Sequence, residues 1–236
     1  MGWYIYILRC GDGTLYTGST DNVEIVQAPV DDDHEIYALT RFCRNNDMTQ
    51  DENYQYVASL VDIDNLIDYM IIQGYCTNGD VQQNLRYIRS ADTGNKWKLA
   101  FYDVDWAFYY HNFFKHVLSP HQAWQHLSIT RAVMKHPDFR EKFLARCSEL
   151  MATTLSDENV IARIDYYEQL LDPEVKRERK RWGGSYAAWK IEVQTLRDFV
   201  LDGEDGYDTP NLMINKLVEY IELTDEEIDK YFSRWR

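Results

Sequence analysis

The sequence predicts an α+β protein that is predominantly helical and carries a short β-hairpin at its amino end. Three observations support this fold class. Strand-forming runs flank an Asp-Gly pair near the start, a second hairpin pattern lies in the middle, and helical periodicity dominates after residue 125. With 236 residues, 45% of them hydrophobic, the chain can bury the core of one large domain or two small ones.

The first expected element is a hairpin within residues 3–18, WYIYILRCGDGTLYTG, with its Gly-Asp-Gly turn at 11–13. Asp-Gly between two runs rich in Tyr and Ile is a strong short-range hairpin signal. The composition changes directly after this segment. We therefore expect two units, a hairpin fragment over 1–22 and the main unit over 23–236.

Two helices are expected next. The segment HEIYALTRFCRN at 34–45 predicts the first. After Asp62 the apolar residues recur at helical spacing, and the Asp62 side chain suits the amino-terminal cap of the second helix. Gly74 and the Thr-Asn-Gly run at 77–79 are expected to end it.

A strand pair follows in the middle of the chain. The segments LRYIRS at 85–90 and KLAFYDVDW at 98–106 have strand-like composition. The Asp-Thr-Gly-Asn run between them, at 92–95, is typical of a hairpin turn. The sequence therefore predicts a second hairpin here.

The rest of the chain is expected to be helical. Helices are predicted over 129–134, 139–151, 157–170, 186–200 and 211–222. Thr-Asp-Glu-Glu at 224–227 is a capping-box pattern that should start the last helix.

Two features of the stretch around residue 180 stand out. Val175–Arg181 reads VKRERKR, and five of its residues are basic. Such a run could dock an acidic substrate or a nucleotide phosphate, although a solvated helix face is the simpler interpretation. Trp182 and Trp189 flank a Gly-Gly pair, and we expect their rings to be buried at a helix junction.

Composition excludes several classes of function. A formal net charge of -14 repels the phosphate backbone, so nucleic-acid binding is not expected. The four cysteines show no CxxC spacing, which argues against a zinc knuckle or a disulfide framework. No basic leader precedes an apolar run, and no window approaches about 18 uninterrupted apolar residues, so neither a signal peptide nor a membrane segment is expected.

The candidate chemistry lies in two acidic clusters. Asp80 and Asn84 occur in NGDVQQN, and Asp103 and Asp105 follow 23 and 25 residues after Asp80, near the end of a predicted strand. Phosphoryl transfer needs an Asp that orients or deprotonates the acceptor hydroxyl, and an Asn and another Asp that hold magnesium on the nucleotide phosphates. Turn and strand-end roles for these residues are the simpler alternative.

The segment LVDIDNLIDYMIIQGYCTNGDVQQNLRYIRSADTGNKWKLAFYDVDWAF resembles the catalytic segment of the CotH kinase family, the spore coat protein H-like kinases. The resemblance implies a lobe like the carboxy-terminal lobe of an atypical protein kinase, with ATP and Mg²⁺ or Mn²⁺ as cofactors. It makes Asp80 the catalytic residue, places Asn84 and Asp103 on the nucleotide and metal, and leaves Asp105 as a further or alternative metal ligand. The implied partners are a nucleotide and a protein substrate, such as a spore coat protein. Because the family acts at the spore surface or after export and no signal segment is found here, the expected location is intracellular or the spore coat.

The amino-terminal part departs from this family. A kinase of this plan uses a cation, usually Lys, on an amino-lobe strand, yet the first lysine here is Lys96. Only Arg9, Arg41 and Arg44 supply cationic side chains before Asp80, and no glycine-rich phosphate loop is present. We therefore expect the amino lobe to be missing. A non-catalytic scaffold or pseudokinase-like binding module is the first alternative to a kinase.

The first 22 residues resemble a different family. Tyr-Ile-Tyr at 4–6 and Tyr-Thr-Gly at 16–18 are similar to the two signature positions of GIY-YIG nucleases. That family has an Arg on the next helix, whereas STDNVEIVQAPVDDD follows here. A nuclease remnant is therefore the second alternative.

Overall fold

The computed structural model describes residues 34–91, 94–108, 113–118, 128–202 and 209–235, and the backbone of 4–9, 15–20 and 23–27. Its strands are β1 Tyr4–Arg9, β2 Leu15–Thr20, β3 Val23–Gln27, β4 Arg86–Ser90 and β5 Lys98–Ala100. Its helices are α1 Glu35–Asn45, α2 Asp51–Leu60, α3 Ile63–Tyr75, α4 Val81–Asn84, α5 Phe113–Leu118, α6 Ser128–Val133, α7 Pro137–Ala152, α8 Asp157–Trp182, α9 Tyr186–Asp202, α10 Thr209–Ile221 and α11 Asp225–Tyr231, followed by the short helix η3 Ser233–Trp235. The predicted fold class, α+β and predominantly helical, is confirmed.

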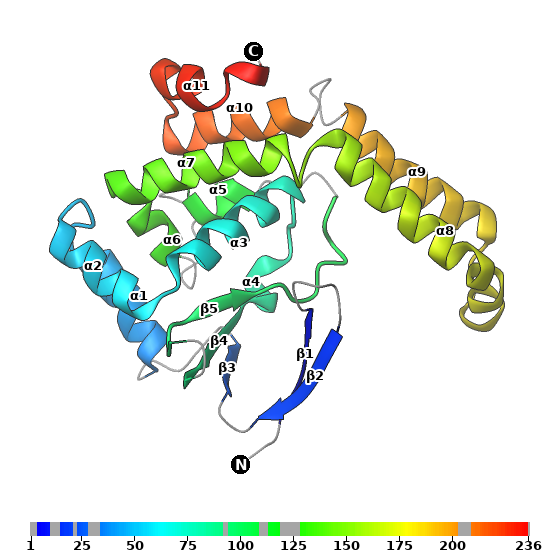
Figure 1. The fold of residues 1–236 in the computed structure, drawn as a ribbon, viewed down its shortest axis with the longest axis horizontal. Helices are drawn as coiled ribbons and strands as arrows, with labels where there is room; N and C mark the ends of the chain where they lie inside the picture. The colour runs from blue at the N-terminus through cyan, green and yellow to red at the C-terminus, as the bar shows by residue number, and fades with distance from the viewer. Residues whose placement is uncertain are drawn as a thin grey trace.

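The described strands form two small antiparallel sheets. β1 pairs with β2, which confirms the amino-terminal hairpin, although its Gly-Asp-Gly turn lies outside the described residues. β3, β4 and β5 form the second sheet in that order, and β3 is a strand that the sequence did not predict. Figure 1 shows both sheets at one end of the molecule, with α1 and α4 beside the second sheet, α3, α5, α7, α10 and α11 above it, and α8 and α9 projecting to one side.

One predicted strand is shorter than expected. The segment at 98–106 is extended only over β5, and residues 101–108 form a loop. Asp103 has φ 53, in the left-handed region that a continuous strand does not use. The β-forming composition of this stretch was therefore overridden by a turn.

Most helix predictions are confirmed in position. The Asp62 carboxylate accepts from Asn65 N at 3.0 Å and caps α3, and Thr224 and Glu227 form the expected capping box of α11. α8 continues to Trp182, well past the predicted end at residue 170, and includes Pro173. α2, α4 and α5 were not predicted.

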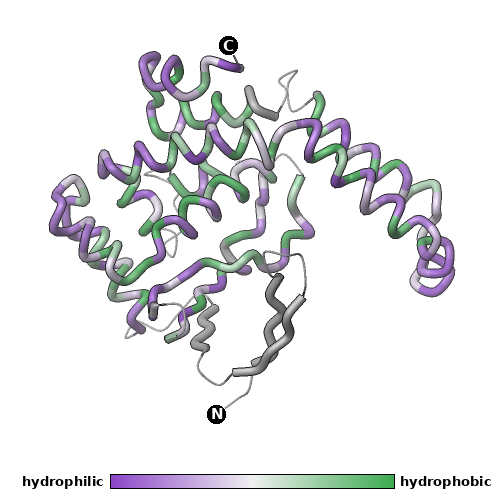
Figure 2. Tube along the Cα trace, in the orientation of Figure 1, coloured by the Kyte–Doolittle hydropathy of each residue, from purple (hydrophilic) through white to green (hydrophobic). Residues whose placement is uncertain are grey.

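The core is centred on α3. Nine of its thirteen residues are buried, so it is apolar on most of its circumference and lies between α7, α5 and the second sheet. Figure 2 shows this central helix mainly in the hydrophobic colour, in contrast to the outer helices. The same core contains the fully buried rings of Trp97, Phe113, Phe114 and Phe139.

Gly74 has a different role from the predicted one. It lies inside α3 and does not end the helix, which continues to Tyr75. A Cβ at this position would lie 2.3 Å from Phe114 Cζ, so the glycine allows the Phe114 ring to pack directly on the α3 backbone. Close packing, and not helix termination, explains this residue.

α8 and α9 form a helical hairpin, which we call the arm, that projects from the rest of the molecule (Figure 1). Trp182, at its tip, is 73% exposed, so the prediction that its ring is buried is wrong. Trp189 is partly buried. The Gly-Gly pair supplies positive φ values of 92 and 93 at the reversal, and this conformational freedom makes the turn.

Candidate functional site

Asp80 follows a tight loop at the carboxyl end of α3. Thr77 adopts φ 48, and Asn78 N donates to Gln73 O at 3.3 Å, so the chain folds back on the helix end. The Asn78 side chain is fully buried, and its Oδ1 accepts from Asp80 N at 3.1 Å. This buried amide holds the backbone of Asp80 in place.

Asp80 and Asn84 contact each other directly. Asn84 Nδ2 lies 3.1 Å from both the backbone oxygen and the Oδ2 atom of Asp80. Val81 and Leu85, 1% and 0% exposed, anchor the single turn of α4 between them in the core. The two predicted residues are therefore held as a pair on a fixed segment.

The hairpin formed by β4 and β5 brings the second acidic cluster to the same end of the molecule. Arg86 pairs with Ala100 and Ile88 with Lys98 in an antiparallel register. Because the strands are antiparallel, the residues before Arg86 and those after Ala100 leave the hairpin at one end. This register places Asp103 near Asp80, although 23 residues separate them in sequence.

Both ends of the 101–108 loop are attached to buried structure. The centroid of the Phe101 ring lies 5.2 Å from the centroid of the Tyr69 ring on α3. Phe108 N donates to Cys76 O at 2.6 Å, and its ring contacts Phe199 of α9 edge to face, with centroids 5.1 Å apart. These contacts fix the loop against both the helical body and the base of the arm.

Asp103 interacts electrostatically with two of the other predicted residues, Asp80 and Asp105. The pKa of its carboxyl group is raised, first by partial loss of water and then by the charge of Asp105 and a hydrogen bond to it. The charge of Asp80 raises this pKa further, whereas Arg86 lowers it. The structure therefore brings Asp80, Asp103 and Asp105 into one acidic cluster with an arginine beside it.

Arg86 is a site residue that sequence reasoning missed. Its guanidinium lies 4.2 Å from the centroid of the Tyr102 ring, directly before Asp103, and its Nη1 donates to Leu85 O at 3.2 Å. Its position on β4, two residues after Asn84, was available in the sequence as a signal. Four large apolar side chains that neighbour Asp103 and Asp105 in the sequence are each about half exposed: Phe101, Tyr102, Val104 and Trp106.

The chemistry of the donor set fits a divalent cation. Carboxylate and carboxamide oxygens are the ligands that Mg²⁺ and Mn²⁺ prefer, and mutual repulsion in the cluster is what a bound cation relieves. Among the described residues, no three His, Cys, Asp or Glu side chains are close enough to ligate one ion together. Mg²⁺ is commonly held by one or two carboxylates together with substrate phosphates, so this spacing is compatible with a nucleotide-dependent site.

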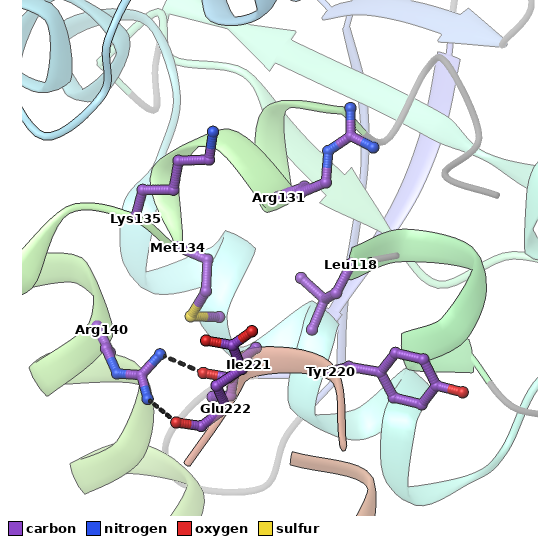
Figure 3. A pocket seen from close by; sticks show the side chains of 8 residues that line it. All are labelled: Leu118, Arg131, Met134, Lys135, Arg140, Tyr220, Ile221 and Glu222. Carbon is purple, nitrogen blue, oxygen red and sulfur yellow. Dashed lines mark hydrogen bonds between the residues drawn. The ribbon is translucent and has the colours of Figure 1, made fainter. Parts of the chain in front are cut away.

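One cavity lies away from the acidic cluster. It has a volume of about 480 Å³ and is bounded by α5, α6, α7 and the end of α10 (Figure 3). Arg140 closes one side by donating to Ile221 O at 2.7 Å and to both carboxylate oxygens of Glu227. None of the predicted site residues lines it. This arginine caps the end of α10 and ties it to α7 and α11.

Comparison with protein families gives a match over most of the chain. The family model described as CotH kinase protein matches residues 16–204. The chain belongs to the CotH kinase protein family. The match contains the α3 end, the hairpin and the 101–108 loop, and it supports a kinase-like function at the level of the family.

Other comparisons are short or negative. A UPF0213 protein of Nitratidesulfovibrio vulgaris is 64% identical over 22 residues, which cover 9% of this chain and 20% of that protein. This match gives partial support to the nuclease-like resemblance of a short segment. No solved structure matches this CotH family member. Within the described parts of the chain, no helix has the length and apolar character needed to cross a bilayer.

Proposed function

We propose that this CotH family protein transfers a phosphoryl group from ATP to a hydroxyl group of a protein substrate. The observation that carries the proposal is the pairing of Asp80 with Asn84 beside Asp103, at the end of a hairpin. Family membership supports the same class of reaction. The spore coat is the proposed source of the substrate.

Each side chain has a proposed role. Asp80 accepts a hydrogen bond from the acceptor hydroxyl and takes its proton as that oxygen bonds to the γ-phosphorus of ATP. The bond from this phosphorus to the β–γ bridging oxygen breaks in the same step, and ADP leaves. Asn84 orients Asp80 and, with Asp103, supplies oxygen ligands for Mg²⁺ or Mn²⁺; Asp105 is the further or alternative ligand. When bound, the cation neutralises charge that develops on the transferred group. The raised pKa of Asp103 reflects partial loss of water and repulsion from neighbouring carboxylates, and a bound cation would relieve this repulsion.

Arg86 is the proposed phosphate-contacting cation. The first two lysines of the chain are engaged elsewhere, because Lys96 Nζ donates to Ala58 O at 2.7 Å and Lys98 Nζ lies 3.1 Å from Asp62 Oδ2. Arg86 is beside the acidic cluster, and a guanidinium can bind phosphate oxygens with two parallel hydrogen bonds.

The engagement of Lys96 and Lys98 also favours a second candidate, a module that binds nucleotide and metal without transfer. The two candidates differ in turnover.

Incubation with radiolabelled ATP, Mn²⁺ and casein should label the acceptor, and Asp80→Asn and Asp103→Asn should remove the label. Asp229→Asn, on α11, removes one carboxylate charge far along the chain and should leave labelling unchanged.

Three outcomes separate the candidates. Equal labelling by the wild type and both site variants would reject the kinase assignment. Absence of labelling together with Mn²⁺-dependent ATP binding would favour the non-transferring module. Absence of both labelling and nucleotide binding would reject both.

A further inference from the structure

The arm is a separate, internally braced structure that the proposed chemistry does not use. Its two helices are joined along their length by polar contacts. Arg197 Nη2 lies 2.6 Å from Asp165 Oδ1, Lys190 Nζ lies 2.7 Å from Glu168 Oε1, and the Tyr186 hydroxyl donates to Asp172 at 2.5 Å. Asp165, Glu168 and Asp172 are on α8 and their partners are on α9. These contacts hold the two helices of the hairpin together.

One outer face of α8 is apolar. Tyr166, Tyr167, Leu170 and Leu171 are 50% to 55% exposed, although side chains of these types are usually buried. Their four-residue spacing places Tyr166 above Leu170 and Tyr167 above Leu171 on the helix surface. The described structure therefore leaves a stripe of four large apolar side chains facing solvent.

The same face becomes basic toward the tip. Arg177 and Arg181 continue the helical row of Tyr166 and Leu170, because they follow it at spacings of seven and four residues. The segment 176–181 contains five basic residues and one acidic residue in a chain with a net charge of -14. Figure 2 shows the tip in the hydrophilic colour, in contrast to the mixed colouring of the middle of the arm.

The charges at the tip are only weakly neutralised within the chain. Arg177 pairs with Glu174 at 2.5 Å, but these side chains are 84% and 59% exposed, and pairs this exposed contribute little. The Arg181 guanidinium lies 5.0 Å from the centroid of the Trp182 ring, which is itself exposed. Cationic and aromatic groups together form an interface-like surface, since Arg and Trp are enriched at binding hot spots.

We propose that this face of the arm docks an acidic segment of a partner protein. Apolar side chains of the segment cover Tyr166 and Leu170, and its carboxylates contact Arg177, Lys180 and Arg181. Charge complementarity favours an acidic partner, because the tip carries a run of basic residues in a chain that is acidic overall. The proposal does not depend on phosphoryl transfer.

A binding experiment with the full chain tests the proposal. The probe is a fluorescein-labelled peptide with a leucine-containing block followed by a glutamate block, and the matched probe has lysine in place of glutamate. Fluorescence anisotropy should show salt-sensitive binding of the glutamate peptide alone. Lys180→Glu with Arg181→Glu should weaken it at least about tenfold, and Tyr166→Ser with Leu170→Ser should weaken it without removing the salt dependence.

The matched control makes the same change of net charge elsewhere. Lys135→Glu with Lys142→Glu, both exposed and outside the arm, should retain the binding of the glutamate peptide. Equal loss in this control would overturn the proposal, because the effect would then come from overall charge. Failure of the wild type to bind the glutamate peptide would also overturn it.

Two further measurements distinguish other occupants. A dimer in analytical ultracentrifugation that disappears in the Lys180→Glu, Arg181→Glu variant would identify a second copy of the chain as the occupant and overturn the proposal. Co-sedimentation with phosphatidylserine vesicles that is lost in the same variant would identify a lipid surface, with the same consequence. Circular dichroism melts should agree for all variants, since every substituted residue is exposed.

Discussion

Asn84 Nδ2 lies 3.1 Å from Asp80 Oδ2, so the side chain of one predicted site residue directly restrains the other. The same nitrogen also donates a hydrogen bond to the Asp80 backbone oxygen at 3.1 Å. Asn84, at the end of α4, is therefore tied to Asp80, the residue that precedes this helix. A carboxylate that must accept a proton in one geometry gains from such a restraint. This relationship leads to the first prediction.

Asn84→Ala should lower the free energy of unfolding by about 1 kcal/mol, the usual contribution of a hydrogen bond, and should lower the rate of acceptor labelling by about 100-fold. Chemical denaturation and radiolabelled ATP measure the two effects. Asn46→Ala is the control, because Asn46 Nδ2 also donates to a backbone oxygen, that of Phe42, at 2.9 Å on the exposed end of α1. A fall in labelling as large in this control would contradict the assigned role of Asn84.

Asp103→Asn should make the metal-free protein more stable at neutral pH. The pKa of Asp103 is raised in the folded state, so its ionised carboxylate destabilises the folded protein at neutral pH. This destabilisation vanishes at low pH, where the carboxyl group is protonated in both the folded and the unfolded protein. Thermal unfolding without metal should show a gain at pH 7.5 that disappears on acidification. Added Mn²⁺ should raise the melting temperature of the wild type more than that of the variant.

Asp47→Asn is the control of opposite sign for this measurement. Hydrogen bonds from Thr49 N and Thr49 Oγ1 lower the pKa of Asp47. Its ionised form therefore stabilises the fold at neutral pH, and the substitution should lower the melting temperature there. A lower melting temperature in Asp103→Asn as well would count against the proposed electrostatic cost of the acidic cluster.

Arg86→Gln should weaken binding of Mg²⁺–ATP about tenfold and affect AMP much less, because the proposed contact is to the outer phosphates. Isothermal titration calorimetry measures both affinities. Arg89→Gln is the matched control on the same strand, since Arg89 pairs with Glu35 and lies 4.2 Å from the Trp97 ring centroid. If Arg86 only balances the carboxylates, the substitution should instead tighten Mn²⁺ binding and leave the preference for ATP over AMP unchanged.

Glu227→Gln should destabilise the protein by about 2 kcal/mol at pH 7. Hydrogen bonds from Arg140, ahead of those from Thr224, lower the pKa of Glu227 from 4.5 to about 2. The stabilisation is therefore present above pH 4.5 and is lost as the pH falls toward 2. Urea denaturation across this range should show the wild type and the variant converging at low pH. Glu226→Gln, an exposed neighbour, should change stability by less than about 0.5 kcal/mol.

Gly74→Ala should destabilise the protein by about 1 to 3 kcal/mol. This loss is expected even though alanine has a higher intrinsic helix propensity than glycine, by about 1 kcal/mol. The added methyl group would lie 2.3 Å from Phe114 Cζ and 2.5 Å from Phe114 Cε2. Adding Phe114→Leu should recover part of the loss in a double-mutant cycle, because a smaller side chain removes the clash. Strict additivity of the two changes would show that the ring contact is not the cause.

Much of the helical fold followed from local pattern. The cap at Asp62 and the capping box at Thr224 were predictable because a cap depends on residues three positions apart. The loop at 101–106 was predicted as a strand because its composition favours β structure, whereas the packing of Phe101 on Tyr69 and the hydrogen bond from Phe108 to Cys76 hold it in another conformation.

The site was predicted as a set of residue types and completed only in three dimensions. Asn78, whose buried amide positions Asp80, has the composition of an ordinary turn residue, and only its burial reveals this role. Arg86 was missed because its importance depends on the ring of Tyr102 and on the neighbouring carboxylates. The boundary between residues 22 and 23, and the roles of the acidic residues in catalysis, stay predictions.

The sequence by itself determined the fold class, the positions of most helices and the identity of the acidic residues, because these depend on periodicity and side-chain chemistry within short segments. The tertiary structure decided which of those residues meet. Asp103 approaches Asp80 because an antiparallel register returns the chain to its starting end, and Gly74 is required because a distant ring packs on it. The exposure of Trp182 was likewise decided by how α8 and α9 pack, which no local pattern specifies.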